Sequence, residues 1–117
     1  MKISFLKAPI GGIIGLEMIT FVEPLGMECV AGGLELEGHT CQIVDMRIDG
    51  IKTGLAKMRA FAPDIVGLQC NFTTERFRAL RLAKMVKDEM PRRHRQVVDV
   101  AAGGRVAGVD RAVLIIN

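Results

Sequence analysis

An apolar strand that ends in a polar loop is the part of this chain best suited to chemistry. Residues 64–70 are predicted to form the strand, and Asn71, Phe72, Thr73 and Thr74 follow it directly, ahead of a predicted helix. In an open α/β sheet, ligands are held by the loops beyond the carboxyl ends of the strands. Amide and hydroxyl side chains there can donate and accept hydrogen bonds. We therefore expect this loop to contact a ligand.

Two glycine-rich segments follow other predicted strands. Gly11, Gly12 and Gly15 come after the first strand, and Gly103 and Gly104 end the fourth. Glycine allows the backbone to approach a ligand closely. The first segment lacks the Gly-x-Gly-x-x-Gly spacing of a dinucleotide site and is not directly followed by a helix. Simpler explanations exist for these features, because threonines cap helices and paired glycines form tight turns.

The composition is that of one globular domain, which we expect to span residues 1–117. Half of the residues are hydrophobic and a quarter are charged. A bilayer-spanning helix needs about 18 uninterrupted apolar residues, and the sequence offers no such run. The opening apolar run is too short for a signal peptide. The default expectations are a cytoplasmic location and no membrane contact.

The three cysteines, Cys29, Cys41 and Cys70, are widely spaced and lie among apolar residues. This pattern favours neither a disulfide framework nor a Cys-x-x-Cys metal site. We expect reduced thiols in the core.

Positive charge is concentrated in the second half of the chain. Residues 71–117 hold ten Lys and Arg against five Asp and Glu, and the net charge of the whole chain is +3. A solvated helix face over residues 76–87, together with a loop that contains Arg92, Arg93 and Arg95, explains most of it. Nucleic acid is not an expected partner, because the chain has no Trp or Tyr that would stack on bases.

Strand and helix patterns alternate along the chain. The predicted strands cover residues 2–7, 40–46, 64–70, 96–102 and 112–116. Near-continuous apolar strands that alternate with helices indicate a parallel sheet covered on both faces. The predicted fold class is α/β, a flavodoxin-like (Rossmann-like) open five-stranded parallel sheet with helices on both faces.

Three helices are predicted between these strands. The first begins at Pro24 and ends near Gly38, the second covers residues 51–61, and the third begins after Thr73 or Thr74 and ends at Pro91. Helical spacing predicts which side chains of the first and third helices face the core: Leu25, Val30 and Leu34, and Phe77, Leu80, Ala83, Val86 and Met90.

Several modules share this architecture, and the residues at the strand ends discriminate between them. A phosphoacceptor receiver needs carboxylates after its first and third strands, where this chain has Ala8-Pro9 and Asn71-Phe72. A flavodoxin needs a hydroxyl-rich turn after its first strand, which residues 11–15 do not provide. A small nucleotide binder and a corrinoid-binding domain remain.

Five short motifs, in their order and spacing, resemble the cobalamin-binding domain found ahead of the barrel in many radical SAM enzymes. The resemblance covers roughly residues 1–104. Each fragment is individually of low specificity, whereas the order of all five is much more specific. The motifs are Glu23-Pro-Leu-Gly-Met27, Leu36-Glu-Gly-His-Thr40, Val44-Asp-Met-Arg47, Pro63-Asp-Ile-Val-Gly67 and Asn71-Phe-Thr-Thr-Glu75.

This resemblance implies that the chain binds cobalamin with the corrin ring on the carboxyl edge of the sheet. The ring would touch the loops after the first, third and fourth strands, and the nucleotide tail would pass between the sheet and a helix. The implied cofactor-binding residues are Ala8, Pro9, Gly11, Gly12, Gly15, Cys70, Asn71, Phe72, Thr73, Thr74, Gly103 and Gly104.

The histidines bear on how cobalt would be coordinated. Many corrinoid-binding folds place an Asp-x-His-x-x-Gly loop after the first strand, and this chain has none there. Residues 45–50 have the spacing with Arg47 in place of His, but they follow the second strand. His39 and His94 each precede a predicted strand, which places them at the amino edge. We expect base-off cobalamin with no protein histidine on cobalt.

The chain is not expected to be an enzyme by itself. Radical SAM chemistry needs a Cys-x-x-x-Cys-x-x-Cys loop for an iron–sulfur cluster, and three isolated cysteines do not form one. The resemblance implies a cofactor carrier for a radical SAM partner or a missing domain. Two alternatives stay open: a noncatalytic interaction or sensing module that uses the basic helix 76–87, and a nucleotide or flavin binder that uses residues 11–15.

Overall fold

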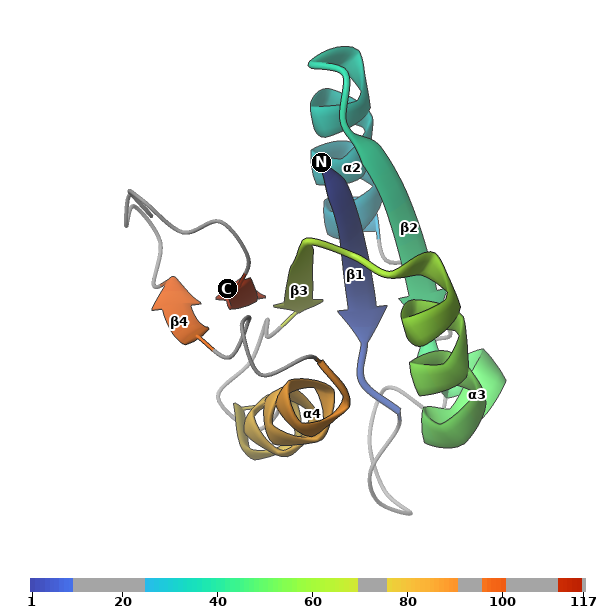
Figure 1. Ribbon diagram of the computed structural model, residues 1–117, viewed down its shortest axis with the longest axis vertical. Helices are drawn as coiled ribbons and strands as arrows, with labels where there is room; N and C mark the ends of the chain where they lie inside the picture. Colours follow the sequence, from blue (N-terminus) through green and yellow to red (C-terminus); the bar gives the residue numbers. More distant parts are fainter. Residues whose placement is uncertain (10–24, 70–75, 91–95, 101–111, 117) are drawn as a thin grey trace.

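The structure, a computed structural model, describes residues 1–9, 25–69, 76–90, 96–100 and 112–116. Strands and helices alternate from the first strand to the fourth, as Figure 1 shows. The elements are β1 (Lys2–Lys7), α2 (Leu25–Leu36), β2 (Thr40–Asp45), α3 (Met46–Phe61), β3 (Ile65–Gln69), α4 (Arg76–Glu89), β4 (Gln96–Val100) and β5 (Ala112–Ile116).

The strands form a sheet in the order β2-β1-β3-β5-β4, and every neighbouring pair is parallel. This confirms the predicted α/β fold with a parallel sheet. The order β2-β1-β3 is that of a flavodoxin-like sheet, whose full order is 2-1-3-4-5. The last two strands are exchanged relative to that order, since β5 lies beside β3 and β4 lies at the edge.

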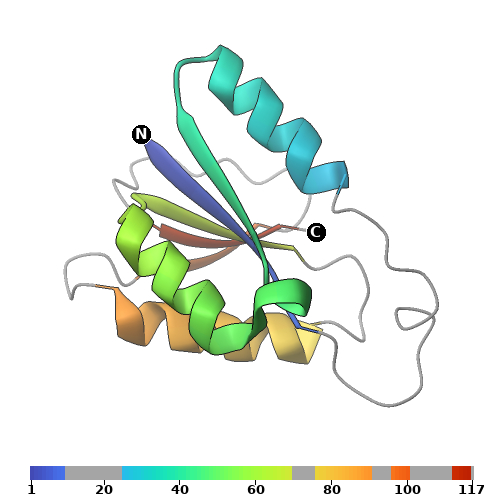
Figure 2. The same cartoon turned by 90° about the vertical axis from the view of Figure 1, so that its right-hand side faces the viewer.

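Helices lie on both sides of the sheet (Figures 1 and 2). Alternate residues of β1 separate the two layers, as expected for a strand buried on both faces. Ile3 and Phe5 pack with Met27 and Ala31 of α2. Leu6 packs on the opposite side, where α3 and α4 cover the sheet.

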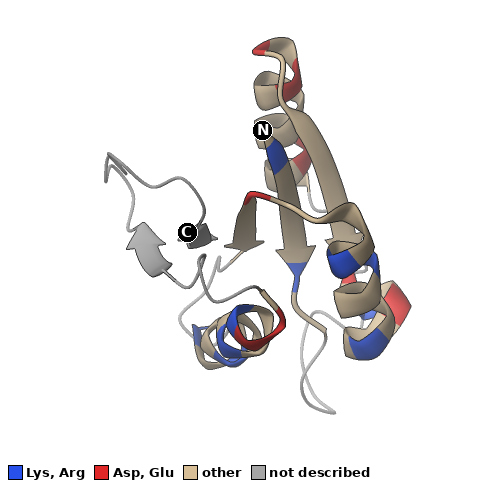
Figure 3. Cartoon of the chain, in the orientation of Figure 1, with Lys and Arg blue, Asp and Glu red and all other residues tan. Residues whose placement is uncertain are grey.

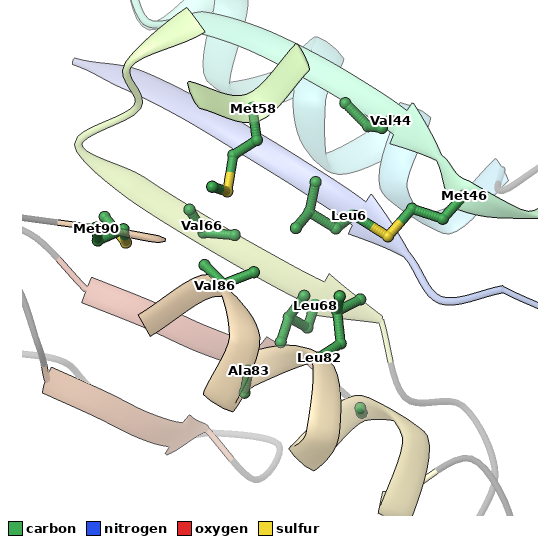
Figure 4. Close-up of a cluster of buried hydrophobic side chains, with 11 residues drawn as sticks. Leu6, Val44, Met46, Met58, Val66, Leu68, Leu82, Ala83, Val86 and Met90 are labelled. Atoms are coloured by element: carbon green, nitrogen blue, oxygen red, sulfur yellow. The ribbon is translucent and has the colours of Figure 1, made fainter. Parts of the chain in front are cut away.

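The larger core cluster lies between the sheet and the helices α3 and α4 (Figure 4). Ser4 is the buried polar residue on this side of β1, and its hydroxyl donates to Oε1 of Gln42 at 3.1 Å. The members of the cluster are apolar and almost fully buried: Leu6, Val44, Met46, Met58, Val66, Leu68, Ala79, Leu82, Ala83, Val86 and Met90.

Helix α2 turns a different face to the sheet from the one predicted. Met27 and Ala31 are buried, whereas Leu25 is 64% exposed and Val30 is 45% exposed. Leu34, the third predicted position, packs partly buried against the core. The prediction was wrong for Leu25 and Val30 because a helix that is apolar on nearly all sides gives no periodic signal for its inner face.

Helix α4 confirms part of its predicted face. Ala83, Val86 and Met90 are buried, but Phe77 is 77% exposed and Leu80 is 41% exposed. Ala79 and Leu82 complete the buried side instead. Helical spacing alone predicted that the larger side chains Phe77 and Leu80 face the core. The helix instead turns Ala79 and Ala83 to the sheet, and these small residues allow it to lie close.

Helix α3 contains a break that separates its first turn from the rest. Gly50 has φ 77° and ψ 170° inside the range Met46–Phe61. The predicted start at Ile51 therefore coincides with the segment after the break. At the other end Ala62 is left-handed, with φ 51°, and its N–H donates to the carbonyls of Met58 and Arg59.

Candidate functional site

The carboxyl edge of the sheet collects the ends of three described strands. The parallel register pairs Lys7 with Asp45, and it sets Leu6 beside Leu68, one residue before Gln69. Helices α3 and α4 follow β2 and β3 along the chain, so they begin on this side of the molecule (Figure 2). A ligand at this edge would therefore meet strand ends and helix N-termini together.

Two of the predicted cofactor-binding residues lie in the described part of the chain. Ala8 and Pro9 directly follow β1 at the carboxyl edge, and both are half-buried. Ala8 also packs against the larger core cluster. The other predicted residues lie outside the described residues and stay predictions: Gly11, Gly12, Gly15, Cys70, Asn71, Phe72, Thr73, Thr74, Gly103 and Gly104.

Gln69, the last residue of β3, adds an amide to this edge that the sequence interpretation had not assigned to the site. Its Oε1 atom is buried. The first turn of α2 passes close by, because a Cβ built on Gly26 would lie 3.8 Å from Nε2 of Gln69. The available signal was a polar side chain at the end of an otherwise apolar strand.

An ion pair joins the end of β2 to the start of α3. Nε of Arg47 donates to Oδ1 of Asp45 at 2.9 Å, and a terminal guanidinium nitrogen donates to Oδ2 at 2.7 Å. The carboxylate also accepts the backbone N–H of Arg47 at 3.0 Å, which caps the helix. The side chains of Asp45 and Arg47 are only 13% and 6% exposed.

The charge state of Asp45 follows from these contacts. Burial pushes the pKa of its carboxyl upward, but hydrogen bonds and charge attraction from Arg47 outweigh burial, and Lys7 adds to them. The pKa therefore lies below its ordinary value of 3.8. Residues 45–50 keep the Asp-x-x-x-x-Gly spacing, with the Arg47 side chain folded back onto Asp45.

His39 lies at the opposite, amino edge of the sheet. Its Nδ1 atom is 3.2 Å from the N-terminal amine of Met1, and the next residue, Thr40, donates its N–H to the carbonyl of Met1 at 2.9 Å. The predicted position of His39 is confirmed. His94 lies outside the described residues.

The cysteines do not all lie in the core. Cys29 is exposed on α2, so the prediction of a core thiol was wrong for this residue, which lies on the outer side of the helix. Cys41 is half-buried, and burial together with the negative charge of Glu35 raises its pKa. Cys70 lies outside the described residues.

Helix α4 carries the basic face that the sequence predicted. Arg76, Arg81 and Lys84 are exposed along it (Figure 3). Within the described ranges, no three His, Cys, Asp or Glu side chains gather as metal ligands. Those ranges also contain no helix that is both long and apolar enough to span a membrane.

Comparison with known proteins places the chain in a family. The model of the family described as the B12 binding domain matches residues 12–115. A hopanoid C-3 methylase from Methylococcus capsulatus is 30% identical over 70 residues, which cover 60% of this chain and 14% of the methylase. No solved structure gives a significant match. Because the family model spans most of its length, the chain belongs to the B12-binding domain family.

Proposed function

We propose that this chain binds cobalamin at the carboxyl edge of its sheet and carries the cofactor for a radical SAM enzyme. The observation that carries the proposal is the match of the B12-binding family over residues 12–115. The described ends of β1 and β3 offer chemistry that suits the cofactor, since Ala8 is small and Gln69 has an amide that could meet corrin amides. Methyl, hydride or radical chemistry would be supplied by the bound cofactor.

The arrangement of the helices supports a path for the nucleotide tail. On its side of the sheet, α2 packs chiefly against β1 and β2. Helix α4 lies against β3, β5 and β4 together with the core cluster of the opposite side. A tail that passes beside α2 and over β3 would begin at Gln69, which lies next to Gly26.

We further propose that cobalamin is bound base-off and without a protein histidine on cobalt. The position of His39 beside Met1, at the amino edge, supports this proposal.

Binding is tested by incubating the purified chain with hydroxocobalamin, removing free ligand and recording the absorption spectrum. We expect corrinoid absorption that stays with the protein at about one equivalent. Protein that elutes without corrinoid colour would contradict the proposal and favour the interaction-module alternative. Release of a yellow flavin or an ultraviolet-absorbing nucleotide on denaturation would favour the alternative of a nucleotide or flavin binder.

Coordination is tested by electron paramagnetic resonance of the cobalt(II) form. We expect no nitrogen splitting. A splitting that changes when the protein is labelled with ¹⁵N would identify a protein ligand, and His39→Ala and His94→Ala would then locate it. A splitting unaffected by the label would show the base of the cofactor still on cobalt.

The radical SAM partner is proposed from the resemblance described above and from the similarity to the methylase. The matched region covers 14% of the methylase. If the partner is a further domain or a neighbouring gene product, its sequence should contain Cys-x-x-x-Cys-x-x-Cys. Sequencing the surrounding genomic region checks this expectation. A neighbourhood without that motif would contradict the radical SAM assignment while leaving cobalamin binding in place.

A further inference from the structure

Helix α2 has an apolar outer face that nothing in the described structure covers. We define this outer face as Leu25, Cys29, Gly32 and Leu36, whose spacing of four, three and four residues puts them on one side of a helix. Leu25 is 64% exposed and Leu36 is 89% exposed. The buried side of α2 is no more apolar, since it consists of Met27, Ala31 and the partly buried Leu34. Apolar residues on two opposite sides of one helix indicate that both sides are covered in the functional assembly.

The charges beside this outer face are all negative. Glu28, Glu35 and Glu37 are exposed on or just after α2. The helix has no Lys or Arg. A surface that covers the outer face of α2 should therefore be apolar at its centre and basic at its rim.

Helix α4 presents such a surface. We define the outer face of α4 as the exposed side chains of Phe77, Leu80, Arg81, Lys84 and Met85. The three apolar members are 77%, 41% and 42% exposed. The basic positions of α4 are blue in Figure 3, and Arg81 and Lys84 lie between Leu80 and Met85 in the sequence. Asp88, exposed four residues after Lys84, is the acidic residue on this face, and the next residue, Glu89, pairs with Arg59.

The two outer faces cannot meet within one molecule, because α2 and α4 lie on opposite sides of the sheet. Contact between two α2 helices would bring Glu28 and Glu35 of both copies together. Contact between two α4 helices would bring together four basic side chains, Arg81 and Lys84 of each copy, against two acidic ones, Asp88 of each copy. The α2–α4 combination instead pairs two apolar centres with rims of opposite net charge.

We propose that the outer face of α2 in one copy docks on the outer face of α4 in a second copy of this chain. The pairing is heterologous, so repeated association gives rings or open strings of molecules. Leu25 and Phe77 begin their helices at the carboxyl edge, but most of each outer face lies further along its helix, so association does not require cobalamin. A single helix pair buries less area than the roughly 1,200 Å² of a stable interface, so the association is weak. The association is salt-sensitive because salt screens the charged rims.

The test is sedimentation velocity over a concentration series up to millimolar protein, at low and at high salt. We expect the average mass to rise with concentration at low salt and to fall when salt is added. The same behaviour is expected with and without hydroxocobalamin. A chain that stays monomeric at millimolar concentration in low salt would overturn the proposal.

Charge reversal identifies the surfaces. Glu28→Lys with Glu35→Lys on α2, or Arg81→Glu with Lys84→Glu on α4, should each weaken association by about tenfold. The variant with all four substitutions should associate again, because the rims of α2 and α4 then carry opposite charges once more. Lys52→Glu, on the exposed side of α3, is the control and should associate like the wild type. Circular dichroism verifies that each variant is folded. Failure of the fourfold variant to recover would show that these two faces do not pair.

Discussion

The ion pair between Asp45 and Arg47 stabilises the start of α3 at the candidate site. One carboxylate caps α3 and binds a guanidinium that is almost fully buried. If the aspartate is removed, the helix loses its cap and a buried cation loses its carboxylate, and both losses are costly. The start of α3 at the carboxyl edge therefore depends on one side chain.

Asp45→Ala is expected to lower the free energy of unfolding at neutral pH by about 3 kcal/mol. Asp49→Ala is the matched control on the same helix. The ion pair that Asp49 forms with Lys57 is more open, because the two side chains are 22% and 51% exposed. Loss of this exposed pair should cost about 1 kcal/mol or less. Urea denaturation of both variants measures the difference, and equal losses would contradict the role given to the buried pair.

The same residue sets a pH dependence. The pKa of the Asp45 carboxyl is lower in the folded chain than its ordinary value of 3.8, so the ionised form stabilises the fold fully above that value. The contribution is lost as the pH falls through the folded-state pKa. Wild type and Asp45→Ala should therefore differ in stability at pH 7 and converge below pH 3.8. Denaturation curves at a series of pH values would show a constant difference if the pair were unimportant.

Among the elements, α3 depends on two glycines for different reasons. Gly50 has a backbone conformation that other residues avoid, and Gly54 lies against the buried side chains of Val44 and Met46. The first permits the break after the capping turn. The second allows the helix to lie close to β2.

Gly50→Ala is expected to destabilise the protein by about 1–3 kcal/mol, because its backbone lies in a region used almost only by glycine. The positive φ of Gly50 is the observation behind this expectation. Gly33→Ala, on the exposed side of α2 with nothing near the added Cβ, is the control and should be neutral or stabilising. Thermal unfolding measures both variants. A neutral Gly50→Ala would mean that the break in α3 can be straightened without loss.

Gly54→Ala should destabilise through overlap in the core. A Cβ there would lie 2.7 Å from Cγ of Met46 and 3.3 Å from Cγ1 of Val44. Overpacking costs about 1–3 kcal/mol, which exceeds the helix-propensity gain of about 1 kcal/mol. Gly32→Ala lacks that overlap and should stabilise. Combining Gly54→Ala with Met46→Ala should cost less than the two losses added together, and strict additivity in urea denaturation would argue against the overlap.

For the whole molecule, cofactor binding and stability are linked. Hydroxocobalamin at about a hundred times its dissociation constant should stabilise the fold by about 2.7 kcal/mol, which raises Tm by about 10 °C in a domain of this size. Flavin mononucleotide at the same concentration is the control and should leave Tm unchanged. Stabilisation by the flavin instead would support the flavin-binding alternative. Thermal scans followed by circular dichroism provide the measurement.

The sequence predicts where the strands lie better than it predicts how side chains pack. Apolar strands bounded by turn residues placed β1, β2 and β3 within one residue of their observed ends. The outward turn of Leu25 and Phe77 was not predictable from spacing, because burial depends on which face meets the sheet. The ion pair between Asp45 and Arg47 could not be predicted, because it depends on the backbone conformation at the start of α3. The proximity of Gln69 to Gly26 could not be predicted either, because it depends on how α2 packs.

The place of β1 between β2 and β3 has a consequence for synthesis of the chain. Strand β1 is synthesised before both of its neighbours, so both of its hydrogen-bonding edges stay open until residues 40–45 and 65–69 follow. Unpaired edges of apolar strands invite pairing with other chains. The nascent protein is therefore most in need of protection before residue 69 emerges, and slowing translation within α3 should increase aggregation more than slowing it within α4.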